Sequence, residues 1–390
     1  MKILLTADWH LDRNNRISDF AKSIQVMVDL AIADNIRKFF IIGDIYRDWQ
    51  ASPVEKDLFH QVLVKLYKHK IDTYVILGNH DIDEKNIANP ITAVQELATL
   101  KALNVAVIAE PSLIPIGTKT ILALPHLSKR FLEAERKKAK AEVSYVDVLR
   151  RYAAHSPSLV LGHVYLPEAI LGASDIGMDS ARAVKLEDLT ATFKVPMVFG
   201  DIHKPQTLCD NPLVAYVGSP DKITFGESTE DKRFLVYDTD AATFQSIPIP
   251  TRNFLDIAVD LKGRSIALKG CVNGDLPLGD GDYMVCLRAF FKAIGSTVVG
   301  SVLKFSVSGH KNDIDQLIRY EITSSLKALN PATIKAVTFN VTDNTAVRDN
   351  AYSTALSDME AFKLWLSKQD YTDAVRAEVA NAATDLLNSK

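Results

Sequence analysis

The chain has 390 residues, of which 47% are hydrophobic and 24% charged, a composition typical of an ordinary globular protein with two or three domains. The formal net charge of -3 at pH 7 argues against a globally basic nucleic-acid binder, so any polyanion would have to meet a local patch. Three scattered cysteines exclude a disulfide framework, and no apolar run is long enough to span a membrane; we therefore expect a cytoplasmic protein without membrane contact.

Five short apolar runs predict buried β-strands at 3–7, 39–42, 74–77, 159–161 and 197–199. Each run is followed by Gly or Asp and has the composition of a strand covered on both faces. Residues 18–35 and 53–69 carry apolar side chains at helical spacing, the second group behind Pro53, a favourable first helical residue. Alternating strands and helices predict an α/β fold in which ligands gather at the carboxyl ends of neighbouring strands.

Residue types that ligate metals follow each of these runs in a fixed order. The segments are Asp8-Trp9-His10, Gly43-Asp44, Gly78-Asn79-His80-Asp81, Gly162-His163 and Gly200-Asp201-Ile202-His203. Any one of them alone is more often an ordinary turn than a ligand pair. The ordered set is different, because two neighbouring divalent ions need this mixture of carboxylates, imidazoles and an amide carbonyl. The sequence therefore predicts a dinuclear metal site.

The pattern changes beyond His203. Short β segments, which we expect to form a second antiparallel layer completing a first domain of residues 1–250, lie at 213–217, 234–237 and 244–250. A smaller α+β unit is expected over residues 251–345, with one helix running from Asp313 past Ile322 between strands at 305–308 and 337–341. Residues 346–390 predict two amphipathic helices, which either pack back on the chain or bind a partner.

With these motifs the chain resembles the calcineurin-like metallophosphoesterases and, in detail, DNA nuclease subunits of the SbcD type. The detail lies in Asp8 to Leu11, Gly200 to Gln206, Tyr216 to Pro220, Phe225 to Glu227 and Lys232. This resemblance, which covers residues 1–240, implies a β-sandwich flanked by helices, a smaller α+β capping domain that contacts DNA, and C-terminal helices. The family includes phage recombination nucleases, which implies a bacterial or phage-infected cell.

The resemblance also implies a role for each ligand residue. A first metal ion would be held by Asp8, His10, Asp44 and His203. A second ion would share the bridging Asp44 and be completed by Asn79, His163 and Asp201. His80 would not be a ligand; it would face the scissile phosphate and protonate the leaving oxygen or stabilise the developing charge. The family favours Mn²⁺ for such a mixed ligand set, with Mg²⁺ as the alternative.

Three positions depart from the family pattern. Asp201 stands where the family usually has His, which adds a negative charge and should favour hard ions. We interpret this as a working variant site, because the other ligand residues are retained. Arg47 stands where Asp or His is usual, and either contacts phosphate or leaves that role to Asp48. Asp12 replaces a usual Gly, and Asp81 is a further candidate for a place near the phosphate or behind the ligands.

The implied function is that of a Mn-dependent DNA nuclease, a double-strand exonuclease and single-strand endonuclease that hydrolyses phosphodiester bonds with water activated by two metals. The implied partners are DNA, an SbcC-type ATPase subunit bound by residues 346–390, and a second copy in a homodimer. The implied setting is DNA recombination, repair or replication. Two alternatives remain open, namely a small-molecule phosphodiesterase or phosphatase on the same core, and a non-catalytic scaffold of a DNA-processing complex.

Overall fold

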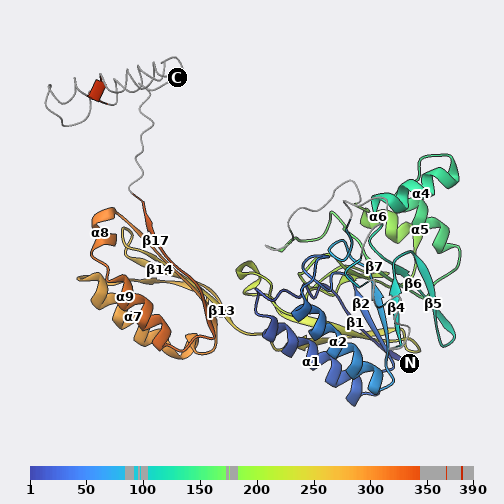
Figure 1. Cartoon of the computed structure of the whole chain (residues 1–390), viewed down its shortest axis with the longest axis horizontal. Helices are drawn as coiled ribbons and strands as arrows, with labels where there is room; N and C mark the ends of the chain where they lie inside the picture. The colour runs from blue at the N-terminus through green and yellow to red at the C-terminus, as the bar shows by residue number, and fades with distance from the viewer. Residues whose placement is uncertain are drawn as a thin grey trace.

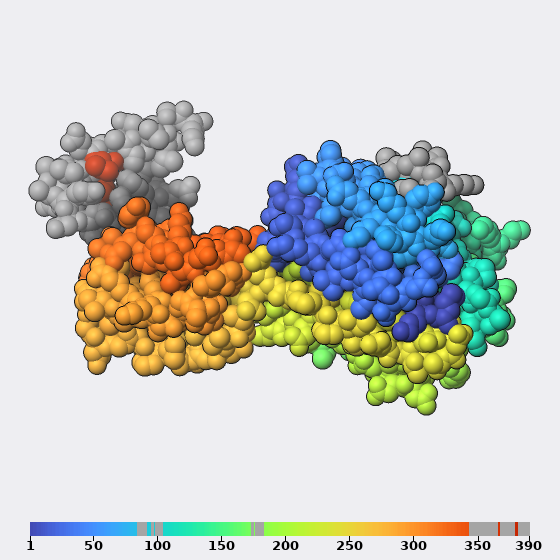
Figure 2. Space-filling model, turned by 90° about the horizontal axis from the view of Figure 1, so that it is seen from below, coloured from blue at the N-terminus to red at the C-terminus, as the bar shows by residue number. Residues whose placement is uncertain are grey.

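The computed structural model of this chain describes residues 1–83, 92–94, 97, 104–172, 175, 183–342, 366 and 379–380. Within these ranges a large α/β unit is followed along the chain by a smaller α+β unit (Figure 1). Figure 2 shows the two units as separate lobes joined at a narrow waist. Among the helices described, none has the length and hydropathy needed to cross a membrane.

The large unit is built on two six-stranded sheets. The first has the order β12 (Thr243–Ile249), β11 (Lys232–Asp238), β1 (Lys2–Thr6), β2 (Lys38–Ile42), β3 (Asp72–Ile76) and β4 (Val105–Ile108). The second has the order β5 (Ser112–Ile116), β6 (Lys119–Leu124), β7 (Leu159–His163), β8 (Met197–Gly200), β10 (Leu213–Tyr216) and β9 (Gln206–Asp210). Because β1 to β3 are parallel in one sheet and β7 and β8 in the other, their carboxyl ends lie at common edges.

Successive side chains of a strand point to opposite faces of its sheet, and this alternation creates three apolar layers in the large unit. On β1, Ile3 and Leu5 point into the layer between the sheets, while Leu4 points to the opposite face. That outer face is covered by α1 (Ile17–Ala33) and α2 (Pro53–Lys68). The outer face of the second sheet is covered by α4 (Lys129–Ala139), α5 (Tyr145–Ala153) and α6 (Leu186–Thr192). The predicted strands covered on both faces, and the two predicted helices, are confirmed.

One expectation for this unit is wrong. The β segments beyond His203 do not form a separate antiparallel layer. Instead, β9 and β10 extend the second sheet beside β8, and β11 and β12 extend the first sheet beside β1. Joining an existing sheet satisfies the backbone donors and acceptors that its edge strand would otherwise leave unpaired.

The small unit is one sheet with helices packed on it. Its strand order is β15 (Gly274–Pro277), β14 (Ser265–Gly270), β13 (Phe254–Asp260), β16 (Val302–Gly309) and β17 (Thr333–Val341). Its helices are α7 (Tyr283–Val298), α8 (Lys311–Asp315) and α9 (Arg319–Ala328). The sequence did not predict α7, and the single helix expected past Asp313 is two, because the chain leaves helical geometry at Ile318. The helices expected within 346–390 lie outside the described residues, apart from 366 and 379–380.

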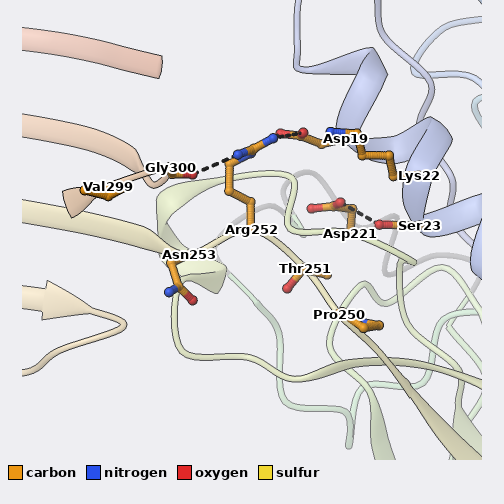
Figure 3. A pocket seen from close by; sticks show the side chains of 10 residues that line it. All are labelled: Asp19, Lys22, Ser23, Asp221, Pro250, Thr251, Arg252, Asn253, Val299 and Gly300. Atoms are coloured by element: carbon orange, nitrogen blue, oxygen red, sulfur yellow. Dashed lines mark hydrogen bonds and ion pairs between the residues drawn. The ribbon is translucent and has the colours of Figure 1, made fainter. Parts of the chain in front are cut away.

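Arg252, in the connection between the units, binds both of them (Figure 3). Its guanidinium donates to both carboxylate oxygens of Asp19 on α1, at 2.9 and 2.6 Å, and to the carbonyl oxygen of Gly300 at 2.8 Å. The guanidinium of Arg16 lies 4.6 Å from the ring centroid of Phe254 at the start of β13. The small unit is therefore attached to the large one by specific side chains as well as by the chain itself.

Candidate metal centre

The predicted ligand residues, together with His80, all lie at the carboxyl ends of five strands, from both sheets. Those from the first sheet follow β1, β2 and β3, and those from the second end β7 or follow β8: Asp8, His10, Asp44, Asn79, His80, His163, Asp201 and His203. The loops after β1 and β2 are tied by backbone hydrogen bonds, from Asp8 N to Gly43 O at 3.1 Å and from His10 N to Asp44 O at 2.9 Å. The edge where the sheets meet thus collects residues from widely separated parts of the chain.

Four of these residues have left-handed backbone conformations, which are uncommon for residues other than glycine. The φ angles are 52° at Asp8, 42° at His10, 52° at Asp44 and 97° at Asp201. Sharp turns of this kind let a chain leave a strand and direct a side chain back over the strand end. Such conformations persist only where the surroundings hold them, and they are typical of functional sites.

Glycines before the ligands allow neighbouring parts of the chain to approach closely. A Cβ atom at Gly43 would lie 2.0 Å from Nδ1 of His163, and one at Gly78 would lie 2.0 Å from Oδ1 of Asp44. A Cβ atom at Gly200 would lie 2.2 Å from the carbonyl oxygen of Ile42. Since no side chain fits at these three positions, the repeated Gly in the motifs has a steric reason.

His163 lies at the centre of one group of ligand atoms. Its Nε2 is 3.0 Å from Oδ1 of Asn79, 3.3 Å from Oδ1 of Asp201 and 3.4 Å from Oδ2 of Asp44. Its Nδ1 faces the carbonyl oxygen of Ile42 at 3.0 Å. This group contains the residues that the resemblance assigns to the second ion.

The other group is centred on His10. Its Nε2 lies 3.4 Å from Oδ2 of Asp44 and 2.9 Å from Nε2 of His203. Asp8 lies beside the group around His163, since its Oδ1 is 3.8 Å from Nδ1 of His163. Asp44 therefore contributes to both groups, as a bridging carboxylate would.

Burial and mutual charge perturb these groups strongly. Burial raises the pKa of Asp8 well above its usual range, despite the opposite effect of His163. At Asp44 burial acts in the same direction, but the neighbouring histidines outweigh it and hold its pKa below the usual value. Burial would lower the pKa of His163, yet Asp44 and Asp201 outweigh it and raise that pKa. Divalent cations would relieve this competition for protons, because they bind carboxylates and imidazoles in their deprotonated forms.

A buried carboxylate oxygen gives a second reason why these residues fit divalent ions. Oδ2 of Asp8 is buried and has no hydrogen-bond partner among the residues that the structure describes. A buried carboxylate oxygen without a partner costs free energy, and a bound cation would provide that partner. Within the same residues, two triads bring their ligand atoms within 4.8 Å of one another, one of Asp8, Asp44 and His163 and one of His10, Asp44 and His80.

His80 is the exposed member of the cluster. Its backbone N–H donates to Oδ1 of Asp44 at 3.0 Å, and its Nδ1 lies 2.7 Å from the carbonyl oxygen of Arg47. Its ring centroid is 4.9 Å from that of His10. The imidazole is thus held at the edge of the cluster, close enough to the ligands for contact with a molecule bound there.

Two positions that depart from the family pattern form one ion pair. Nη1 of Arg47 lies 2.8 Å from Oδ2 of Asp12, whose side chain is buried while that of Arg47 is 71% exposed. Asp48 accepts the backbone N–H of Gln50 at 2.9 Å and so stabilises its own turn.

Asp81 lies behind the ligands and joins two loops. Its carboxylate accepts backbone N–H groups of Asp44, Ile45 and Gly78, at 2.9, 3.0 and 2.9 Å. Burial, together with the charge of Asp44, raises the pKa of this carboxyl group. Asp81 therefore fixes the loop after β2 against the loop after β3, which is where Asp44 and Asn79 are held.

One residue beside the cluster was not predicted. Asp175 is buried, and its Oδ1 lies 3.1 Å from both the backbone N and Nδ1 of His203. No strand end or periodic pattern marks this position in the sequence, which is 28 residues from its partner. Only the folded chain could have revealed it.

Comparison with known proteins identifies a family and several relatives. Residues 1–205 match the calcineurin-like phosphoesterase family. The SbcD subunit of the nuclease SbcCD of Bacillus subtilis (strain 168) is 25% identical over 274 residues, covering 63% of this chain and 69% of that protein. Exonuclease subunit 1 of Enterobacteria phage T4 is 24% identical over 273 residues, covering 68% and 72%. The SbcD subunit of Escherichia coli (strain K12) is 22% identical over 267 residues, covering 60% and 63%.

Proposed function

Because this chain belongs to the calcineurin-like phosphoesterase family, we propose that it hydrolyses phosphodiester bonds of DNA as the nuclease subunit of a two-component complex. Family membership supports the reaction class, a metal-dependent hydrolysis of phosphate esters. The names of the relatives, a nuclease subunit and an exonuclease subunit, support DNA as the substrate and a partner protein. We take the partner to be an SbcC-type ATPase and the setting to be DNA recombination, repair or replication.

The observation that carries the proposal is the convergence of carboxylates and imidazoles where the two sheets meet. We assign the first ion to Asp8, His10, Asp44 and His203. We assign the second ion to Asp44, Asn79, His163 and Asp201. Mn²⁺ is the ion we expect, and when bound the two ions would supply an activated water and neutralise charge on the phosphate oxygens.

The chain itself holds the proton donor. The carbonyl oxygen of Arg47 can only accept a hydrogen bond, so Nδ1 of His80 must carry the hydrogen between them. Nε2 of His80 is then the atom that can hold or pass a proton at the leaving oxygen. The ion pair between Arg47 and Asp12 restrains the loop that supplies this carbonyl, and so keeps the imidazole oriented.

Cleavage of DNA is tested with purified protein in Mn²⁺ or Mg²⁺, with and without EDTA. The substrates are linear duplex, circular single-stranded DNA and a nitrophenyl phosphate ester. We expect Mn²⁺-dependent cleavage of both DNAs and little turnover of the ester, and Asp44→Asn should abolish cleavage because it removes the shared ligand. Turnover confined to the ester would favour a small-molecule phosphatase. No turnover of any substrate, even with the ATPase partner, would favour a scaffold.

The partner assignment has its own test. Deleting residues 350–390 should abolish co-purification with an SbcC-type ATPase while leaving two bound Mn²⁺ ions per chain. Co-purification that survives the deletion would exclude this segment as the binding element. Analytical ultracentrifugation of the intact chain would test the proposed homodimer, which should sediment at twice the mass of the 43.1 kDa chain.

A further inference from the structure

We propose that Asp175 is a positioning residue that orients His203 and strengthens it as a ligand of the first ion; the inference rests on the metal assignment above. Asp175 lies outside all five motifs, and nothing in the comparisons gives it a role. Its role follows from the way its carboxylate holds His203 and from the hydrogen that the imidazole must then carry.

The carboxylate of Asp175 holds His203 at two points. Its Oδ1 accepts the backbone N–H of His203 at 3.1 Å and faces Nδ1 of the same residue at 3.1 Å. Its Oδ2 accepts the backbone N–H of Gly172 at 2.6 Å. The side chain of Asp175 has no exposed surface, so water does not weaken these contacts. Such a fully bonded, buried carboxylate has little freedom to move.

The contact with Nδ1 determines the tautomer of His203. A carboxylate only accepts, so Nδ1 of a neutral His203 must carry the hydrogen. The lone pair is then on Nε2, which faces Nε2 of His10 at 2.9 Å. The imidazole therefore presents its electron pair toward the neighbouring ligand, which is the form a metal ion requires. Acceptors behind ligating histidines act in this way and also raise the basicity of the ring.

The acceptor behind His203 differs from those behind the other two oriented imidazoles. Nδ1 of His163 faces the carbonyl of Ile42, and Nδ1 of His80 faces the carbonyl of Arg47. Both of those acceptors are neutral, whereas Asp175 is a carboxylate. The negative charge of Asp175 therefore favours a hydrogen on Nδ1 of His203 more strongly than a neutral carbonyl would.

The backbone carbonyl of His203 is held by separate contacts. Its carbonyl oxygen accepts the backbone N–H of Ser219 at 3.1 Å and Nζ of Lys232 at 3.0 Å. Lys232 is buried and paired with Glu227 at 2.7 Å and with Glu230 at 2.8 Å. These contacts restrain the backbone, but none of them reaches the imidazole. Asp175, by contrast, contacts the imidazole itself at Nδ1.

Ile170, in the same stretch of chain as Asp175, also contacts Gln206, three residues beyond His203. The backbone N–H of Ile170 donates to Oε1 of Gln206 at 2.9 Å, and Nε2 of Gln206 donates back to Ile170 O at 2.9 Å. Contacts at Gln206 and His203 together place this segment alongside the motif. The position of Asp175 is thus supported by more than its own side chain.

The test measures metal binding rather than cleavage. In Mn²⁺ titrations followed by calorimetry and by electron paramagnetic resonance of free Mn²⁺, Asp175→Asn should weaken one of two ions about 10- to 100-fold. Glu55→Gln is the matched control, because Glu55 is also buried and accepts the backbone N–H groups of Arg13 and Ser52, which are not assigned ligands. It should bind both ions as the wild type does. Unchanged affinity for both ions in Asp175→Asn would overturn the proposal.

A double-mutant cycle tests whether Asp175 acts through His203. In a His203→Ala background, Asp175→Asn should cause no further loss of affinity, because the ring that it orients is gone. An additional loss as large as in the wild type would contradict the proposal. A wild-type chain that binds two ions yet cleaves no DNA would sink the nuclease proposal and leave this one standing.

A measurement on the unaltered chain covers the case in which Asp175→Asn fails to fold. Nitrogen-15 NMR of the metal-free protein, with His203 assigned by substitution, distinguishes the two imidazole tautomers. We expect the hydrogen on Nδ1 with slowed exchange, because Nδ1 faces a buried carboxylate. A hydrogen on Nε2 would refute the positioning role.

Discussion

Three imidazoles near the strand ends share one arrangement, because each turns Nδ1 toward an oxygen. The oxygens belong to Ile42 behind His163, to Arg47 behind His80 and to Asp175 behind His203. Two of the three acceptors are backbone carbonyls, which any residue at that position can supply. A side-chain motif search cannot detect such acceptors, although they decide which nitrogen is presented.

At His80 we predict that substitution by alanine separates chemistry from metal binding. His80→Ala should retain two Mn²⁺ ions while cleavage of DNA falls about 10²- to 10⁴-fold, the range typical of a lost general acid. Metal content by mass spectrometry and initial rates on linear duplex give the two readings. Loss of an ion would instead make His80 a ligand, a role that its proximity to His10 and Asp44 allows.

At Asp201 we predict a change in metal preference. Asp8, Asp44 and Asp201 carry three negative charges against the four positive charges of two divalent ions, and Asp201→His would leave two. The variant should bind two ions but shift its relative activity from Mg²⁺ toward softer ions such as Co²⁺ or Zn²⁺. Rates across these metals, normalised to bound metal, measure the shift. An unaltered metal profile would remove Asp201 from the ligand set.

At the scale of elements, the site exists because β2, β7 and β8 approach more closely than side chains allow. Glycines at the strand ends make this approach possible, and the left-handed turns after them aim the ligands inward. The strands themselves are ordinary apolar runs covered on both faces. Strand composition thus builds the sandwich, and the residues just beyond each strand build the site.

We predict that Gly200→Ala destabilises the sandwich. The added methyl group would lie 2.2 Å from the carbonyl oxygen of Ile42, so β2 and β8 must separate. Overpacking of this kind costs about 1 to 3 kcal/mol, and metal affinity should fall with it. Urea unfolding measures the change. Gly295→Ala in α7 is the control, since its methyl would meet only Leu329 at 3.7 Å and should stabilise slightly.

At the scale of the whole molecule, the orientation of the small unit depends on a few charged and aromatic contacts. Arg252 joins α1 to the turn after α7 (Figure 3). Arg16 lies against Phe254. Two domains joined by a small, polar interface usually move relative to one another unless specific contacts restrain them. The ion pair of Arg252 with Asp19 is such a restraint.

We predict that Arg252→Ala loosens this connection. Removing a partly buried, charge-assisted pair should cost about 1 to 3 kcal/mol and broaden the spin-label distance between α1 and α7. Arg288→Ala, which breaks an exposed pair with Glu321 inside the small unit, is the control and should leave that distance unchanged. An unbroadened distance in Arg252→Ala would show that the pair does not restrain the units.

The same pair has a pH dependence. Burial alone would raise the pKa of Asp19, but hydrogen bonding and charge from Arg252, and charge from Arg16, outweigh it and lower that pKa below its ordinary value. The stabilisation is therefore complete above the unfolded pKa of about 4 and is lost as the pH falls through the lower folded value. The difference in unfolding free energy between the wild type and Asp19→Asn should shrink as the pH is lowered from 6 toward 2. A difference that persists at the acid end would contradict this account.

The sequence by itself determined the α/β class, the five strands and the residues gathered at their ends, because strand composition, terminal glycines and ligand types are local signals. It also indicated the phosphoesterase family, which the match over residues 1–205 confirms. It did not indicate α7 or the break before α9, and it misplaced the β segments beyond His203, whose sheet partners lie far away in sequence.

Only the tertiary structure decided how distant side chains pair. In the sequence, Asp12 and Arg47 are two separate departures from the family pattern. In the fold they form one ion pair. Asp175 has no sequence signal, and its importance arises from where its carboxylate lies relative to His203. The physical reason is the range of the forces that act. Secondary structure reflects neighbours a few residues apart, whereas hydrogen bonds and charge pairs depend on distances that exist only once both sheets have packed.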